Sequence, residues 1–245
     1  MEGYIVKFIV CDSYEEMSRR GAEIIADVMT AKPACLLGLA TGSTPVGMYR
    51  ELIAMNAAGK IDFSSVTTYN LDEYYPISPE NDQSYRYFMN TNLFDHVNID
   101  KKNTHVPDGS AADPDAACRA YDEAYALTGG ADVQVLGIGQ NGHIAFNEPE
   151  EALTVGTHVT GLTEDTIRAN SRFFASIDEV PTRALTMGMG SIMMAKKIIL
   201  LANGKNKHAA IAAMLNDKIT TAVPATLLKL HPDVVVICDK EAYNG

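Results

Sequence analysis

Tryptophan is absent from this chain of 245 residues, and no apolar run approaches the roughly 20 residues that a membrane-spanning helix needs. The chain starts Met1-Glu2-Gly3, without the basic segment that opens a signal peptide. We therefore expect neither export nor insertion into a membrane, and we expect a cytoplasmic protein.

Cysteine is scarce as well. The four cysteines lie far apart in the sequence, with no spacing typical of a disulfide framework, at Cys11, Cys35, Cys118 and Cys238. We interpret them as small buried hydrophobic residues of a reduced protein. Neither an HExxH motif nor a paired CxxC motif occurs, which argues against a zinc site, and we expect no metal.

Positive charge is in short supply, because 20 Lys and Arg face 31 Asp and Glu, for a net charge of −11. Nucleic acids and anionic membranes both require a basic face, so we expect neither as a partner. An anionic small molecule would have to be held by a local group of cations and backbone amides.

Short β-branched or aliphatic runs alternate with helix-length amphipathic segments. We expect strands at Ile5–Val10, Cys35–Ala40, Val66–Asn70, Val133–Ile138, Ala184–Met187, Ile198–Ala202 and Val234–Cys238. We expect helices at Ser13–Met29, Pro45–Ala57, Ser84–Leu93, Ala112–Leu127 and Asn206–Leu215. This alternation predicts a single-domain α/β fold over residues 1–245, with a mostly parallel, twisted, Rossmann-like sheet and helices on both faces. Ligands bind at the carboxyl edge of such a sheet.

Residues 150–182 are polar and weakly periodic, between two predicted strands. A long excursion of this kind inside a compact domain is usually functional, and we expect a lid over the site. The alternative is a helix packed quietly at the surface.

Residues 137–149 read Gly-Ile-Gly-Gln-Asn-Gly-His-Ile-Ala-Phe-Asn-Glu-Pro and follow an apolar predicted strand. Three glycines, a histidine and a carboxylate at the end of a buried strand are typical of an active-site loop. Glu148 or Asn141 would fix the tautomer and orientation of His143, which would act as an acid or base. A lone histidine more often has a structural role, but this setting favours catalysis.

The same segment matches the dinucleotide-binding pattern Gly-x-Gly-x-x-Gly. That pattern belongs in a first strand–helix–strand unit and opens a long helix, whereas these glycines lie near mid-chain and Pro149 would end any short helix. We therefore expect no dinucleotide and no other cofactor.

A second motif, Ala40-Thr41-Gly42-Ser43-Thr44-Pro45, joins a buried strand to a helix. Glycine, hydroxyls and the free amides of a helix start form a phosphate cradle, so Gly42, Ser43 and Thr44 are candidate phosphate ligands. The alternative is ordinary helix capping by one of the two hydroxyls.

Two adjacent acids, Asp72 and Glu73, follow another apolar run. A carboxylate with little solvent at the sheet edge can take a proton from carbon. The alternative is that these acids complement the N-terminus of a helix. Cations are scattered, and the candidates to neutralise a phosphate are Arg172, Lys205 and Lys207, although exposed surface is the commoner place for a lysine.

Taken together, these motifs resemble the isomerising glucosamine-6-phosphate deaminases. The resemblance extends over nearly the whole chain and includes residues 36–45, 70–74, 84–85, 94–97, 137–149, 169–174, 224–226 and 230–232. It implies the fold that deaminases share with 6-phosphogluconolactonases. The implied reaction converts D-glucosamine 6-phosphate and water to D-fructose 6-phosphate and ammonia, in amino-sugar catabolism.

The resemblance also implies roles for individual residues. Asp72 would move the proton from C2 to C1, and His143 would assist ring opening while held by Glu148 and Asn141. The phosphate ligands would be Gly42, Ser43, Thr44, Arg172 and Lys207. No metal or organic cofactor is implied.

Two departures from the better-known branch of the family stand out. Asn141 replaces an aspartate and cannot add charge beside the histidine. His158 and Thr160 stand where the allosterically activated hexamers carry basic residues, and this chain ends early, at Gly245. We expect no such activation, and a monomer or a simple homo-oligomer.

Two competing hypotheses remain. A 6-phosphogluconolactonase would share the sheet and the glycine–histidine loop, but it lacks the Phe-Asn-Glu-Pro continuation and the Asp-Glu-Tyr motif. A phosphosugar sensor without activity would have no need of a base at Asp72.

Overall fold

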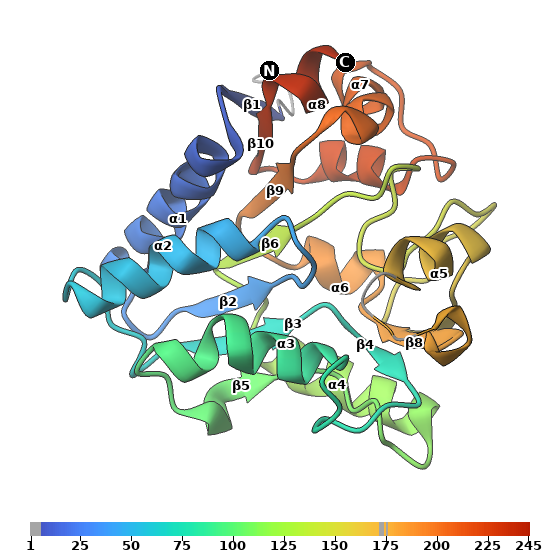
Figure 1. Cartoon of the computed structure of the whole chain (residues 1–245), viewed down its shortest axis with the longest axis horizontal. Helices are drawn as coiled ribbons and strands as arrows, with labels where there is room; N and C mark the ends of the chain where they lie inside the picture. The colour runs from blue at the N-terminus through green and yellow to red at the C-terminus, as the bar shows by residue number, and fades with distance from the viewer. Residues whose placement is uncertain (1–5, 172–173, 175) are drawn as a thin grey trace.

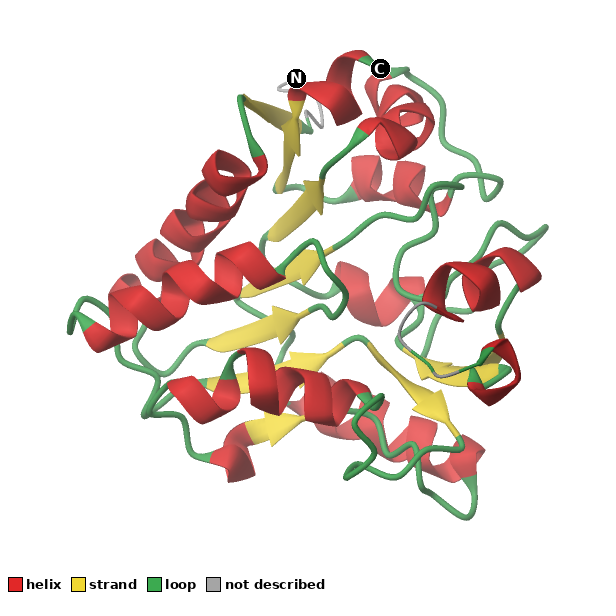
Figure 2. Cartoon of the chain, in the orientation of Figure 1, coloured by secondary structure: helices red, strands yellow, loops and turns green. Residues whose placement is uncertain are grey.

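The larger of two sheets forms the centre of the molecule (Figures 1 and 2). The computed structural model describes residues 6–171, 174 and 176–245. All neighbouring strands of this sheet are parallel, in the order β1-β10-β9-β6-β2-β3-β5. Its strands are β1 (Lys7–Cys11), β2 (Leu36–Leu39), β3 (Thr67–Asn70), β5 (Thr104–His105), β6 (Val133–Leu136), β9 (Ile198–Ala202) and β10 (Val234–Asp239).

The smaller sheet is antiparallel and has the order β4-β8-β7. It contains β4 (Asp72–Tyr75), β8 (Arg183–Thr186) and β7 (His158–Gly161). A single residue, Leu71, separates the end of β3 from the start of β4, so the chain passes directly from the parallel sheet into the smaller one (Figure 1).

Helices cover both faces of the parallel sheet. The first three, α1 (Tyr14–Ala31), α2 (Val46–Ala57) and α3 (Tyr85–Asn92), lie on the near face in Figure 1, and α4 (Pro114–Leu127) and α6 (Met189–Met193) lie behind it. The remaining helices are α5 (Glu164–Asn170), α7 (His208–Leu215) and α8 (Lys240–Asn244). Short 3-10 helices are η1 (Phe94–His96), η2 (Lys101–Asn103), η4 (Ile177–Glu179), η5 (Lys205–Lys207) and η6 (Pro224–Leu230).

Local sequence accounts for where several helices begin. Ser13 accepts a hydrogen bond from the Glu16 N–H and so caps α1, and Asp113 caps α4 in the same way ahead of Pro114. A capping side chain satisfies an amide that the helix itself leaves unpaired, and proline at the first helical position has no N–H to leave unpaired.

The core lies along the central strands, where every residue of β2, β6 and β9 is buried. Burial on both faces explains why these strands are continuous apolar runs rather than alternating ones. At about 1.5–3 kcal/mol for each large aliphatic side chain, this burial is the main source of stability.

The α/β prediction is confirmed, but several boundaries and elements differ. Helix α7 begins at His208 rather than Asn206, because Lys205–Lys207 form a 3-10 turn first. The strand expected at Ala184–Met187 runs from Arg183 to Thr186 and belongs to the smaller, antiparallel sheet. Strands β4, β5 and β7 and helices α5, α6 and α8 were not predicted.

Strand order places one crevice at the carboxyl edge. From β2 the chain proceeds to β3 and β5 on one side, and it then returns to β6 on the other side of β2. The loops after β2 and β6 therefore diverge, and open α/β sheets bind ligands at such a switch point. Within the described part of the chain, no helix is long and apolar enough to cross a membrane.

Candidate active site

The loop after β6 contains no helix between Gly137 and Thr157, unlike the long helix that follows the glycines in a dinucleotide-binding unit. Gly139 is required by close packing, because a Cβ there would lie 2.5 Å from the His143 ring. Gly142 has a φ of 84°, in the left-handed region that glycine adopts without strain. The glycines thus let the backbone fold around His143.

His143 is held by a network of side chains. Its Nδ1 lies 3.1 Å from each carboxylate oxygen of Glu148. The Asn141 amide donates to Glu148 Oε2 at 2.7 Å, and Asn141 Oδ1 accepts the His143 backbone N–H at 3.1 Å. Asn141 therefore bonds to both His143 and Glu148.

Glu148 is an anion in this setting. Burial raises the pKa of the Glu148 carboxyl, but hydrogen bonds from His143, Thr166 and Asn141 outweigh burial and lower that pKa to about 2. An ionised carboxylate only accepts hydrogen bonds, so Nδ1 of His143 must carry the proton. The Nε2 atom is then the ring nitrogen available for proton transfer.

Asp72 opens β4 and is only 6% exposed. Burial, and next the charge of Glu73, raise the pKa of Asp72 from 3.8 to about 8. A carboxylate with a raised pKa is a stronger base once it has lost its proton. The position and the basicity both suit the predicted role of carbon base.

Glu73 has a different partner set. Its carboxylate accepts the backbone N–H groups of Tyr74 at 2.9 Å, Tyr85 at 2.8 Å and Arg86 at 2.9 Å. The last two belong to the first turn of α3, whose N-cap is Ser84. Burial raises the pKa of Glu73 to about 7, while these three donors act in the opposite direction. Glu73 thus complements a helix N-terminus, which was the alternative interpretation of these two acids. The helix is α3, which begins 12 residues further along the chain.

The small sheet connects Asp72 to the histidine loop. Asp72 is the cross-strand partner of Thr186, and the Thr186 hydroxyl accepts the Phe146 backbone N–H at 3.1 Å. Asn147 adds a second link, because its amide donates to the Met187 carbonyl at 2.8 Å. Both catalytic candidates are therefore anchored to β8.

The hydroxyls of the loop after β2 do not cap α2, and the Gly47 N–H in the first turn of this helix donates to Tyr14 Oη at 2.8 Å. Gly42 has a φ of 93°, and α2 begins after Pro45 with no side-chain cap, so the capping alternative for Ser43 and Thr44 is wrong. The Thr44 hydroxyl donates instead to Asn203 Oδ1 at 3.0 Å. This bond joins the loop after β2 to the loop after β9.

The loop after β9 carries the lysine candidates. Asp239, the last residue of β10, accepts the Gly204 N–H at 2.9 Å and so fixes the start of η5. Lys207 is half-buried and Lys205 is exposed. Arg172 lies outside the described residues, so its place in the site stays a prediction.

Side chains that sequence reasoning missed complete this arrangement. They are the acceptor Asn203, the anchors Thr186 and Asp239, and Thr166, which donates to Glu148 at 2.6 Å. Each acts across a long sequence separation, and no local motif marks it. In the described part of the chain, no group of three or more His, Cys, Asp or Glu side chains is arranged to hold a metal ion.

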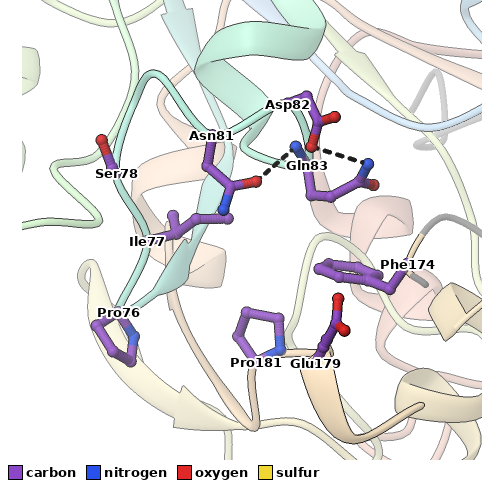
Figure 3. Close-up of a pocket in the computed structure, with 9 residues that line it drawn as sticks. All are labelled: Pro76, Ile77, Ser78, Asn81, Asp82, Gln83, Phe174, Glu179 and Pro181. Atoms are coloured by element: carbon purple, nitrogen blue, oxygen red, sulfur yellow. Dashed lines mark hydrogen bonds between the residues drawn. The ribbon is translucent and has the colours of Figure 1, made fainter. Parts of the chain in front are cut away.

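A separate groove of about 430 Å³ lies beside the smaller sheet (Figure 3). Asn81 and Gln83, from the segment after β4, lie opposite Phe174 and Glu179 (Figure 3). Neither Asp72 nor His143 is among its lining residues. The groove is therefore distinct from the site that the motifs predict.

Comparison with known proteins gives consistent results. The family model described as glucosamine-6-phosphate isomerases/6-phosphogluconolactonase matches residues 12–237. The glucosamine-6-phosphate deaminase of Thermoanaerobacter pseudethanolicus is 57% identical, over 97% of this chain and 94% of the relative. That of Clostridium perfringens is 56% identical, over 97% and 98%.

Solved structures agree. A monomeric glucosamine-6-phosphate deaminase superimposes with a TM-score of 0.95 at 44% identity, covering 97% of this chain and 98% of the other. The 6-phosphogluconolactonase of Thermotoga maritima has a TM-score of 0.78 at 21% identity, covering 96% and 100%, and shows the shared fold alone. The resemblance inferred from the motifs is thus confirmed: the chain belongs to the glucosamine-6-phosphate isomerase/6-phosphogluconolactonase family, and within it to the glucosamine-6-phosphate deaminases.

Proposed function

We propose that this protein converts D-glucosamine 6-phosphate and water to D-fructose 6-phosphate and ammonia, with Asp72, His143, Glu148 and Asn141 as its catalytic group. The observation that supports it best is that two different acid–base groups are tied to one small sheet, Asp72 within it and the His143 loop by hydrogen bonds to its edge. Asp72 has a raised pKa, and His143 is held by an anionic Glu148.

Ring opening is the first task. The pyranose must lose a proton from the C1 hydroxyl and gain one at the ring oxygen. Nε2 of His143 is suited to carry that proton, because Nδ1–H is engaged by Glu148. Asn141 and Glu148 position the imidazole ring of His143, and neither needs to contact the sugar.

Isomerisation follows in the open chain. Asp72 takes the proton from C2 while the C1 oxygen gains a proton, which gives an enolamine. Asp72 then returns its proton to C1, which leaves a protonated imine at C2. Water adds to the imine carbon, and ammonia leaves, so that a ketone remains. One carboxylate serves both carbons because they are adjacent.

Phosphate binding supplies the orientation. Gly42, Ser43 and Thr44 offer backbone amides at the switch point, and Ser43 adds a hydroxyl. Lys207 and Arg172 supply positive charge in an otherwise acidic protein. The energy of binding a remote phosphate holds the reacting carbons in line.

We further propose a monomer without activation by an amino-sugar phosphate. A relative at 44% identity is described as monomeric. His158 lies in β7, where its Nδ1 is 3.0 Å from the Gly156 carbonyl, and Thr160 is its near neighbour on the same strand. Neither supplies the fixed positive charge that an anionic effector needs.

The expected lid over residues 150–182 stays a proposal, and its first part is tied down. The Thr157 N–H donates to Asp122 of α4, and β7 pairs with β8 along its length. Closure would therefore involve the part after Gly161. Protection of that part from proteolysis by a substrate analogue would support closure, whereas unchanged cleavage would argue against it.

The location is part of the same proposal. All four cysteines lie in the described part of the chain, and each is buried with a free thiol. Free thiols are stable in a reducing compartment, which supports the cytoplasm.

One assay tests the reaction. Purified protein is incubated with glucosamine 6-phosphate, and ammonia and fructose 6-phosphate are both measured. Equal release of the two products supports the proposal. Tight binding without turnover would favour a sensor, and hydrolysis of 6-phosphogluconolactone alone would favour the lactonase.

A further inference from the structure

Thr166 makes a contact that the proposed mechanism does not use. This residue lies in the first turn of α5 and is only 7% exposed. Its hydroxyl donates to Glu148 Oε1 at 2.6 Å, from 18 residues away in the sequence. Glu148 is itself buried, so the contact joins two groups that water does not reach freely.

The two carboxylate oxygens of Glu148 have different partners. Oε1 accepts the Thr166 hydroxyl, whereas Oε2 accepts the Asn141 amide and is hydrogen-bonded to the His143 ring. His143 Nδ1 is nevertheless 3.1 Å from both oxygens. Each oxygen thus has one further donor, Thr166 at Oε1 and Asn141 at Oε2, and the two donors together fix the orientation of the carboxylate that faces the ring.

Thr166 is not an isolated donor. The Thr163 hydroxyl, which caps α5, donates to Thr166 Oγ1 at 3.1 Å, and the Thr166 backbone N–H is bonded to Thr163 Oγ1. Hydrogen bonds in a chain polarise one another, so the Thr163 contact strengthens the donation from Thr166 to the carboxylate. It also fixes the rotamer of Thr166.

We propose that Thr166 is a positioning residue for the deaminase reaction: it occupies Oε1 of Glu148 and, opposite Asn141 at Oε2, fixes the carboxylate plane and with it the plane of the imidazole. This inference rests on the proposed roles of His143 and Glu148. Without the Thr166 hydroxyl, Asn141 still holds Oε2 but Oε1 has lost its donor, so the carboxylate can turn and more of its charge is available to the ring.

The principal test is T166V, which keeps the shape of the side chain and removes its hydroxyl. We expect kcat to fall about tenfold while KM stays within about twofold, because the lost contact aligns a catalytic group rather than binds the substrate. T166S restores the hydroxyl and should recover kcat to within about twofold of the unaltered enzyme. The matched control is T160V, which changes a half-buried threonine on β7 and should alter neither kcat nor KM.

A spectroscopic measurement separates positioning from packing. In substrate-free protein with 15N-labelled histidine, the proton on Nδ1 of His143 reports its hydrogen bond to Glu148. In T166V that resonance should move downfield, since a carboxylate relieved of one donor accepts more strongly from the other. T166S should return it, and T166A serves as a smaller variant without the hydroxyl should T166V not fold.

The proposal is overturned by a resonance that stays in place or moves upfield in the variants without a hydroxyl, or by a loss of kcat that T166S does not recover. Because the resonance is read without substrate, absence of turnover in the unaltered enzyme would refute the proposed function and leave this measurement intact.

Discussion

Asp72 lies directly opposite Thr186 in the antiparallel pair of β4 and β8. The Thr186 hydroxyl in turn accepts the backbone N–H of Phe146, which lies between His143 and Glu148. The proposed carbon base and the proposed ring-opening pair are thus both linked to one short strand, although about 70 residues separate them in the sequence. A rigid common support keeps their separation constant through the reaction.

Replacing Asp72 should abolish proton transfer and spare binding. In D72N we expect kcat to fall by about three orders of magnitude or more, with little change in affinity for the phosphate ester. Exchange of the C2 proton with deuterated solvent, followed by NMR, is the direct measurement. Full exchange in D72N would remove Asp72 from its assigned role.

The same variant should be more stable than the unaltered enzyme at high pH. The folded pKa of Asp72, about 8, lies above its ordinary value of 3.8, so the folded state holds the proton more tightly than the unfolded state. Stability therefore falls as pH rises from about 4 to about 8. D72N lacks this loss, so its Tm should be higher at pH 9, by roughly 2–4 °C for each kcal/mol of stability that the charged carboxylate costs, and equal at pH 4.

Calorimetry across this pH range measures the difference. D82N, which changes an exposed carboxylate in the loop after β4, is the control and should leave Tm unchanged at every pH. If the Tm of D72N depended on pH in the same way as that of the unaltered enzyme, the raised pKa of Asp72 would be contradicted.

Glu73 should tune Asp72 through charge. The Glu73 carboxylate is the second cause, after burial, of the raised pKa of Asp72. In E73Q that pKa should fall, and the acid limb of kcat/KM should move to lower pH by roughly half a unit to one unit. E73Q also replaces the oxygen that accepts the Arg86 N–H with an NH2 group. That N–H then has no acceptor, and the free energy of unfolding should fall by about 1–3 kcal/mol.

The control for this change is E80Q, at an exposed glutamate in the loop after β4, which should move neither the limb nor the melting temperature. If E73Q folds and the acid limb of its kcat/KM profile stays at the same pH, the Glu73 charge does not raise the pKa of Asp72.

Asn141 should resist conversion to the aspartate of the other branch. N141D replaces the 2.7 Å donor to Glu148 with a second carboxylate, and repulsion between like charges then raises the pKa of both acids. Glu148 starts from a pKa of about 2, so the repulsion acts wherever both acids are ionised. Tm should drop at pH 8, and the loss should be smaller near pH 4, where one of the two acids can bind a proton. N141A removes the donor without adding charge, and its loss of Tm should be the same at both pH values.

The lysines after β9 should differ in their effect on substrate binding. Lys207 is half-buried and Lys205 is exposed. We expect K207M to raise KM at least about tenfold, because a charge-assisted bond to phosphate is lost, with a smaller effect on kcat. K205M should change KM by less than about twofold. Inhibition by inorganic phosphate checks the assignment, and a larger effect in K205M would reverse it.

The central sheet could be predicted because its signals are local. The apolar runs of β2, β6 and β9 are buried on both faces, and each ends in glycines or polar residues that mark the carboxyl edge. The smaller sheet could not be predicted, because β4 pairs with β8 more than 100 residues away and its sequence, Asp-Glu-Tyr-Tyr, has no strand-like alternation.

The identities of the candidate catalytic groups were determined by the sequence itself: Asp72, Asn141, His143 and Glu148 stand in short motifs whose residue types suit the chemistry. Tertiary structure alone decided how they are held. Thr166 reaches Glu148 and Asn203 reaches Thr44 only after distant segments come together. Hydrogen bonds depend on distance and angle, which the chain acquires by folding, whereas the donors and acceptors themselves are present in every conformation.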